Sequence, residues 1–153
     1  MLTGIHCNLL LENNCKTTRI QSLQVTLNQS PSEVFNFLSD FTNYEKLMPE
    51  QVTDWVSDSE TCSFSIKGMA SLGMAFDTKT PDSEIKIKRN GKAPFDFFLI
   101  CNIGKIDNSD SSTLNLFFDA DLNPFLKMMA EKPLTNFLNL LVDRYKAITD
   151  SIA

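Results

Sequence analysis

Few residues of this sequence have the types and spacing that acid–base or nucleophilic chemistry requires. Histidine, the commonest general base, occurs once, as His6, in a polar segment at the start of the chain. No serine or cysteine can be paired with a histidine as an activated nucleophile. Asp119 and Asp121 are two residues apart, and paired carboxylates can transfer protons or bind a metal. Strand alternation places both opposite Phe118, where a solvated face is the simpler interpretation, so no catalytic residue is assigned.

The cysteines indicate a compartment rather than a reaction. They are Cys7, Cys15, Cys62 and Cys101. Neither a CxxC pair nor the Cys/His spacing of a zinc site occurs, so we expect no metal and no cofactor. Cys62 and Cys101 lie in apolar stretches and are predicted to be buried free thiols. The first residues lack the basic and apolar regions of a signal peptide, which predicts a reducing cytoplasm.

Charge and composition narrow the range of partners. Fourteen Lys and Arg against nineteen Asp and Glu give a net charge of −5, which is the wrong sign for neutralising phosphates. No apolar run approaches the length of a membrane span. We therefore expect neither nucleic-acid binding nor stable membrane insertion. Twelve Phe against two Tyr and one Trp supply apolar area without polar groups, which suits a dry core or a pocket for an apolar ligand.

Three segments carry helix signals. A capping box at residues 30–33, with proline at the first helical position, starts one short helix. A second short helical segment is predicted over residues 43–48. Residues 123–153 predict one long amphipathic helix, capped by Asn123 and kinked at Pro133. The apolar stripe of this helix comprises Leu126, Ala130, Phe137, Leu141, Tyr145 and Ile148.

Strand patterns occupy most of the remaining chain. Leu23, Val25 and Leu27 alternate with polar residues and predict a half-buried strand. Further strands are expected over residues 52–57, 62–67, 69–79, 84–89, 95–103 and 113–122, with a hairpin signal at Asn90-Gly91. Strands segregated from helices indicate an α+β domain. Residues 1–18 have no clear hydrophobic period and are predicted to be an N-terminal extension. Residues 19–153 are predicted to form one domain.

This order of elements resembles the START/SRPBCC superfamily, whose helix-grip fold is shared with the birch-pollen-allergen group. Residues 30–49 read SPSEVFNFLSDFTNYEKLMP and look like the helix pair of that superfamily. The matching positions are Pro31, Val34, Phe35, Phe37, Leu38, Asp40, Phe41, Asn43, Tyr44, Leu47 and Pro49. Residues 119–141 resemble the end of its last strand and its grip helix. Over residues 19–150 the resemblance implies a curved antiparallel sheet of about seven strands, two short helices and one long C-terminal helix.

Members of the superfamily are mostly pockets for apolar molecules, although fold does not fix function. We therefore expect non-enzymatic binding or carriage of a small hydrophobic ligand, such as a lipid, a quinone or a polyketide-like molecule, between the sheet and the long helix. The residues expected to line this cavity are Trp55, Phe64, Ile66, Met74, Phe76, Ile87, Phe97, Leu99, Leu116, Phe118, Met128, Met129 and Phe137.

Other interpretations of the same residues stay open. Trp55 has the opposite strand parity to Val52 and Val56, so it either guards a cavity mouth or packs under the short helices. The apolar residues can also fill the core without leaving a pocket. The alternative functions are a small cyclase- or hydratase-type enzyme that uses Asp119, Asp121 or a cavity water, and a co-chaperone-like module that binds a protein partner.

Overall fold

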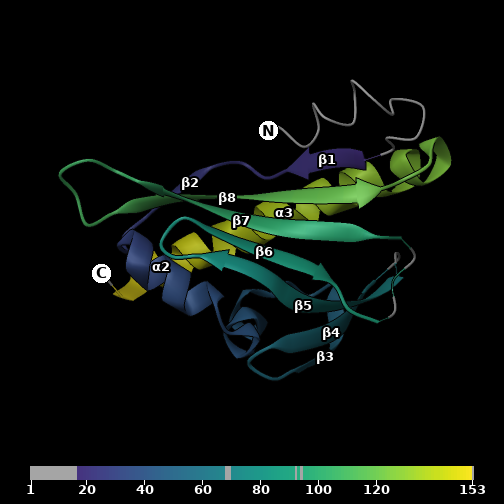
Figure 1. Ribbon diagram of the computed structural model, residues 1–153, viewed down its shortest axis with the longest axis horizontal. Helices are drawn as coiled ribbons and strands as arrows, with labels where there is room; N and C mark the ends of the chain where they lie inside the picture. The colour runs from purple at the N-terminus through teal and green to yellow at the C-terminus, as the bar shows by residue number, and fades with distance from the viewer. Residues whose placement is uncertain (1–16, 68–69, 92, 94, 153) are drawn as a thin grey trace.

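The computed structural model describes residues 17–67, 70–91, 93 and 95–152, in which an antiparallel sheet of eight strands curves around one long helix (Figure 1). The strands are β1 (Thr17–Gln21), β2 (Val25–Leu27), β3 (Val52–Ser57), β4 (Thr61–Ile66), β5 (Ala70–Thr80), β6 (Glu84–Arg89), β7 (Phe97–Lys105) and β8 (Ser112–Asp121). The helices are α2 (Pro31–Leu38), the 3₁₀ helix η1 (Phe41–Leu47) and α3 (Pro124–Ile152). None of these helices has an apolar stretch that could cross a bilayer. The predicted α+β helix-grip architecture is confirmed.

The predicted helix caps are present. The Ser30 hydroxyl accepts a 3.2 Å hydrogen bond from the Glu33 N–H, and the Glu33 carboxylate accepts a 2.9 Å bond from the Ser30 N–H. At the start of α3, the Asn123 side chain accepts a 2.9 Å bond from the Leu126 N–H. Each cap satisfies a backbone donor that has no partner within the helix, so both helices begin where the sequence predicts.

The first strand differs from its prediction. It is divided into β1 and β2, and Leu23 between them is 66% exposed rather than half-buried. Gln21 pairs with Phe117 and Val25 with Leu114, so four steps along one chain match three along the other. Ser22 accounts for the break, because its N–H bonds the Leu116 carbonyl and its hydroxyl accepts from the Leu116 N–H, both at 2.9 Å. This irregularity turns Leu23 outward and raises the strand count to eight.

The hairpin between β6 and β7 is longer than the sequence suggests. Gly91 adopts a φ of 82°, a left-handed conformation that favours glycine, as expected for a turn. Asn90, however, still bonds the Gly73 carbonyl across the sheet at 2.8 Å. The connection therefore begins only after Asn90, and β7 does not begin until Phe97.

The concave side of the sheet faces α3, and Figure 1 shows that α2 covers the end of the sheet where α3 finishes. On β8 the side chains of Leu114, Leu116, Phe118 and Ala120 alternate inward and are buried. The facing side of α3 buries Leu134, Phe137, Leu138, Leu141, Val142 and Tyr145. The predicted apolar stripe of the helix is thus the side that contacts the sheet, and the candidate site must lie between these two layers.

The predicted extension over residues 1–18 overlaps β1, which begins at Thr17, and residues 1–16 lie outside the described residues. His6, Cys7 and Cys15 are among these. Removing residues 1–16 retains β1, so we expect the melting temperature to fall by less than about 8 °C, roughly the effect of losing 2 kcal/mol in a domain of this size.

Removal of residues 1–21 is the matched truncation. It also deletes β1, with the buried Ile20 and the Arg19–Asp119 ion pair, and should lower the melting temperature considerably more. Thermal unfolding followed by circular dichroism compares the two truncations. Equal losses would show that the fold depends on residues 1–16 rather than on β1.

Candidate ligand-binding site

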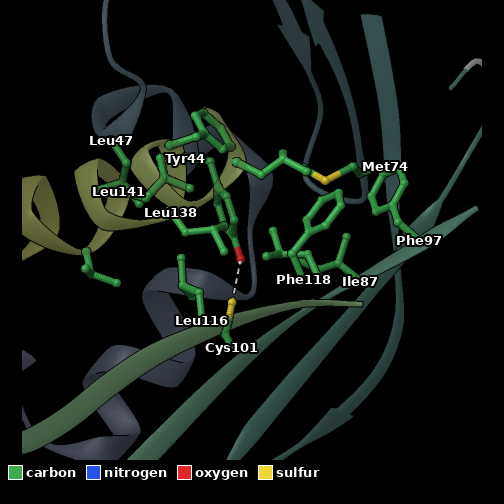
Figure 2. Close-up of a cluster of buried hydrophobic side chains, with 14 of the residues drawn as sticks. Tyr44, Leu47, Met74, Ile87, Phe97, Cys101, Leu116, Phe118, Leu138 and Leu141 are labelled. Atoms are coloured by element: carbon green, nitrogen blue, oxygen red, sulfur yellow. Dashed lines mark hydrogen bonds between the residues drawn. The ribbon is translucent and has the colours of Figure 1, made fainter. Parts of the chain in front are cut away.

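The space between the sheet and α3 contains most of the predicted lining residues. Nine of them are buried in one continuous core, namely Phe64, Ile66, Met74, Ile87, Phe97, Leu99, Leu116, Phe118 and Phe137. Figure 2 shows several of these side chains converging from the strands toward Leu138 and Leu141 of α3 and toward Tyr44 of η1. Phe76 and Trp55 are partly buried and pack against the same core. Eleven of the thirteen residues therefore lie in the core or pack against it.

Met128 and Met129 are the two predicted lining residues that lie outside the core. They are 78% and 60% exposed, so they point away from the sheet and cannot line its interior. Helix geometry explains the error, since each residue turns about 100° around the axis. Met128 lies two residues from both Leu126 and Ala130, which face the sheet, and this spacing turns it to the far side of the helix. Enlarging either methionine would not narrow an interior cavity.

Trp55 reaches the core because β3 contains a bulge. The step from Thr53 to Val56 on β3 matches only the step from Ser65 to Ser63 on β4, so one extra residue is accommodated. Asp54 takes up the irregularity with a φ of 58°. The strand parity read from the sequence is therefore broken before Trp55. Its indole lies 5.3 Å from the Phe64 ring, and its N–H bonds the Ser57 hydroxyl at 3.0 Å.

The interior is nearly filled. Among the described residues, two voids of about 20 Å³ and about 10 Å³ lie there, and both are lined by Tyr44, Leu99 and Leu141. A void of this size holds about one water molecule, whereas pockets for drug-sized ligands measure roughly 300–1,000 Å³. Stacked rings occupy much of the space, including Phe97 on Phe118 with centroids 4.9 Å apart. The structure thus describes a closed core with two small packing defects.

Tyr44 supplies a polar group at the centre of this core. Its hydroxyl donates a 2.7 Å hydrogen bond to the Leu38 carbonyl and lies 3.9 Å from the Cys101 sulfur (Figure 2). Burial raises its pKa well above the ordinary value, so the phenol stays neutral. Tyr44 is not among the site residues predicted from the sequence. A signal existed, because a tyrosine among so many phenylalanines marks a place where a hydroxyl is needed.

The second tyrosine has a similar role nearer the rim. Tyr145 of α3 is buried, and its hydroxyl donates a 2.7 Å bond to the Gln29 side chain. Its ring lies 4.6 Å from that of Phe37. Desolvation raises its pKa, as it does for Tyr44. Both tyrosines therefore act as neutral hydrogen-bonding groups at the edge of the larger void.

Asp119 and Asp121, the carboxylates considered for catalysis, lie outside this core. Asp119 accepts two hydrogen bonds from Arg19, at 2.7 and 2.8 Å, and the guanidinium also lies 4.4 Å from the centroid of the Phe117 ring. These side chains stand on the convex face, opposite Phe118, and Asp121 is exposed at the strand end. Among the described residues, the buried polar side chains apart from the tyrosines are Ser22, Ser112, Asn115 and Thr149. No described carboxylate reaches the interior.

A wider hollow lies at the rim, where the β6–β7 connection meets the start of α3. Its volume is about 370 Å³, and its lining includes Arg89, Asp96, Asp121, Phe95 and Leu126. Arg89 and Asp96 form an ion pair at 3.0 Å across it. Phe95 stands between this hollow and the core, because its ring also meets Phe118 edge-on at 6.2 Å. Phe118 in turn lines the smaller void, so the rings of Phe95 and Phe118 connect the rim to the interior.

Cys62 and Cys101 are buried thiols, as predicted, and burial raises the pKa of each to about 12. At pH 8 almost none of either thiol is ionised, and only the thiolate is nucleophilic. In a Cys7→Ser/Cys15→Ser variant, we expect a thiol reagent to label the folded protein at least 100-fold more slowly than the denatured protein. Rapid labelling of the folded protein would contradict the closed core and show that the interior opens often.

Solved structures of other proteins have the same architecture, although the sequence itself has no recognisable match. No protein-family model matches the sequence, and no curated protein does. A START superfamily protein from Mycobacterium smegmatis is 14% identical over 88% of this chain and 99% of its own, with a TM-score of 0.65. Norcoclaurine synthase from Thalictrum flavum, in complex with dopamine and hydroxybenzaldehyde, is 12% identical over 92% of each chain, with a TM-score of 0.67.

A third structure, an uncharacterised protein from Bacillus thuringiensis, is 8% identical over 86% of this chain and 98% of its own, with a TM-score of 0.67. At such identities the likeness concerns the fold alone. It agrees with the strand order, the helix pair and the gripped α3 described above. The chain therefore shares the helix-grip fold of these structures.

Proposed function

We propose that this protein binds a small, mainly apolar ligand between the concave face of the sheet and α3, around Tyr44. The observation that carries the proposal is the pair of voids that share Tyr44, Leu99 and Leu141 as lining. Apolar walls favour an apolar ligand, and a few polar groups fix its orientation. Among the described residues that line the voids, the Tyr44 and Tyr145 hydroxyls and the Cys101 thiol are the polar groups available. Norcoclaurine synthase, which has the same fold, was solved with two small aromatic molecules, and this supports aromatic ligands as the class to test.

Binding requires the interior to expand, because the two voids together hold no more than a few water molecules. The first half of α3 is the part that can move at least cost. Its inward residues are the half-buried Leu126 and the small Ala130, whereas the second half buries six large side chains. Pro133 lies between the halves and lacks the N–H that would bond the Met129 carbonyl. We infer that α3 bends at Pro133 when a ligand enters.

The rim hollow gives the ligand a place to enter. It borders Leu126 of the movable half-helix and Phe95, whose ring separates the hollow from Phe118. Rotation of Phe95 together with displacement of Leu126 would join the hollow to the smaller void. The Arg89–Asp96 ion pair at the mouth is exposed, so it can reorganise in water at little cost.

A second candidate function has its own supporting observation. The core is closed, yet Phe125, Met128 and Met129 are exposed together at the start of α3. An exposed apolar patch on a domain with a filled core is typical of a surface that contacts another polypeptide. This observation favours the protein-interaction alternative over the enzymatic one, for which no described interior carboxylate provides support.

A pair of tryptophan substitutions tests the ligand proposal. Leu141 lines both voids, so Leu141→Trp should fill them and lower the affinity for a neutral fluorescent naphthylamine at least tenfold, about 1.4 kcal/mol. Met129→Trp is the matched control, because that side chain is exposed and should leave the affinity unchanged. Fluorescence titration gives both dissociation constants.

Overpacking at Leu141 can also destabilise the protein by roughly 1–3 kcal/mol, so unfolding curves accompany the titrations. If Leu141→Trp does not fold, Leu141→Phe makes the same comparison with less added volume. Failure of the unmodified protein to bind the probe would count against the ligand proposal, as would equal effects of the two tryptophans.

A further inference from the structure

The start of α3 exposes an apolar face that the core does not use. Phe125, Met128 and Met129 are 66%, 78% and 60% exposed. Their spacing of three and four residues places them on one side of the helix. Ala130 and Leu134, which are buried, lie on the opposite side. We call the three residues the outer patch of α3. Single exposed apolar residues are common, but a contiguous set at helical spacing indicates a contact surface.

The pairing of β1 with β8 places the start of β1 at the same end of the sheet as the start of α3. Thr17 pairs with Asp121 at the end of β8, and Asp121 is only four residues before Phe125. β1 is an edge strand, so Thr17 lies at the rim of the sheet. Figure 1 shows β1 at the same end of the molecule as the first turns of α3. The point at which residues 1–16 join the fold is therefore at the end of the molecule that carries the outer patch.

The sequence of residues 1–16 is suited to covering such a patch. Leu9, Leu10 and Leu11 form an apolar run, and a polar connector, residues 12–16, joins this run to β1. Six residues from Leu11 to Thr17 can span up to about 20 Å. The patch itself is short, because four residues of helix rise only about 6 Å. The run can therefore reach every part of the patch while β1 stays in its place.

We propose that the apolar run Leu9–Leu11 binds the outer patch of α3. The tether makes this contact intramolecular, so it forms at a high effective concentration and needs little area to be populated. The docking itself requires only the patch and the tether, and it stands or falls independently of ligand binding.

Disulfide trapping tests the proposal in the full-length chain. Cys7 lies two residues from the apolar run, and Cys15→Ser leaves it as the reactive native thiol, since burial raises the pKa of Cys62 and Cys101 to about 12. We expect Met128→Cys to form an intramolecular disulfide with Cys7 at least tenfold faster than Lys127→Cys. Lys127 is also exposed and is the neighbour of Met128 in the sequence, but it lies about 200° around the helix from Phe125. Non-reducing electrophoresis and peptide mass mapping measure both rates.

A second variant separates docking from mere proximity. Leu9→Asp with Leu10→Asp keeps the length of the tether and should reduce trapping at position 128 to the rate found at position 127. These changes lie outside the described fold and leave its core intact. Equal rates at the two helix positions in the unmodified sequence would overturn the proposal. Disulfides formed chiefly between two molecules would also overturn it and would assign the patch to a second copy of the chain.

Discussion

The hydrogen bond from the Tyr44 hydroxyl to the Leu38 carbonyl is the interaction on which the arrangement of this domain depends. A hydroxyl in an apolar core must find a partner, and the last carbonyls of a helix have none within that helix. The 2.7 Å bond satisfies both groups and folds η1 back against α2. Phe41 of η1 then stacks on Phe76 of β5 with centroids 4.1 Å apart, which joins the helix pair to the sheet.

The same helix pair is held from outside by one side chain of the sheet. Lys79 bonds the Ser39 carbonyl at 3.0 Å, and its ammonium group lies 4.2 Å from the centroid of the Phe76 ring. Contacts of this kind leave no buried side-chain nitrogen or oxygen without a partner in the described part of the chain. A core in which every polar group is satisfied has one preferred packing. Any ligand admitted to it must therefore offer the Tyr44 region contacts as good as those it displaces.

Sequence patterns predicted the fold well because most elements carry local signals. Caps at Ser30 and Asn123 and strict alternation along β8 are properties of neighbouring residues, so a single sequence contains them. The predictions were wrong where contacts between residues far apart in the sequence determine the local structure. Ser22 interrupts the first strand by bonding Leu116, and the bulge at Asp54 depends on how β3 meets β4. The candidate site was predicted less well, because apolar alternation identifies the side that a residue faces but not whether a cavity remains between two packed layers.

The pairing of β8 with strands that are distant in the sequence has a consequence for biosynthesis. This strand pairs with β7 on one side and with both β1 and β2 on the other, and the pairing of Thr17 with Asp121 joins residues far apart in the chain. Ribosomes add about 5–20 residues per second, so β1 is synthesised roughly 5–20 s before its partner exists. During that interval the nascent chain has apolar strands with unpaired edges, the state that chaperones recognise. Completion of the sheet must therefore await the synthesis of β8, by which time most of this domain has been made.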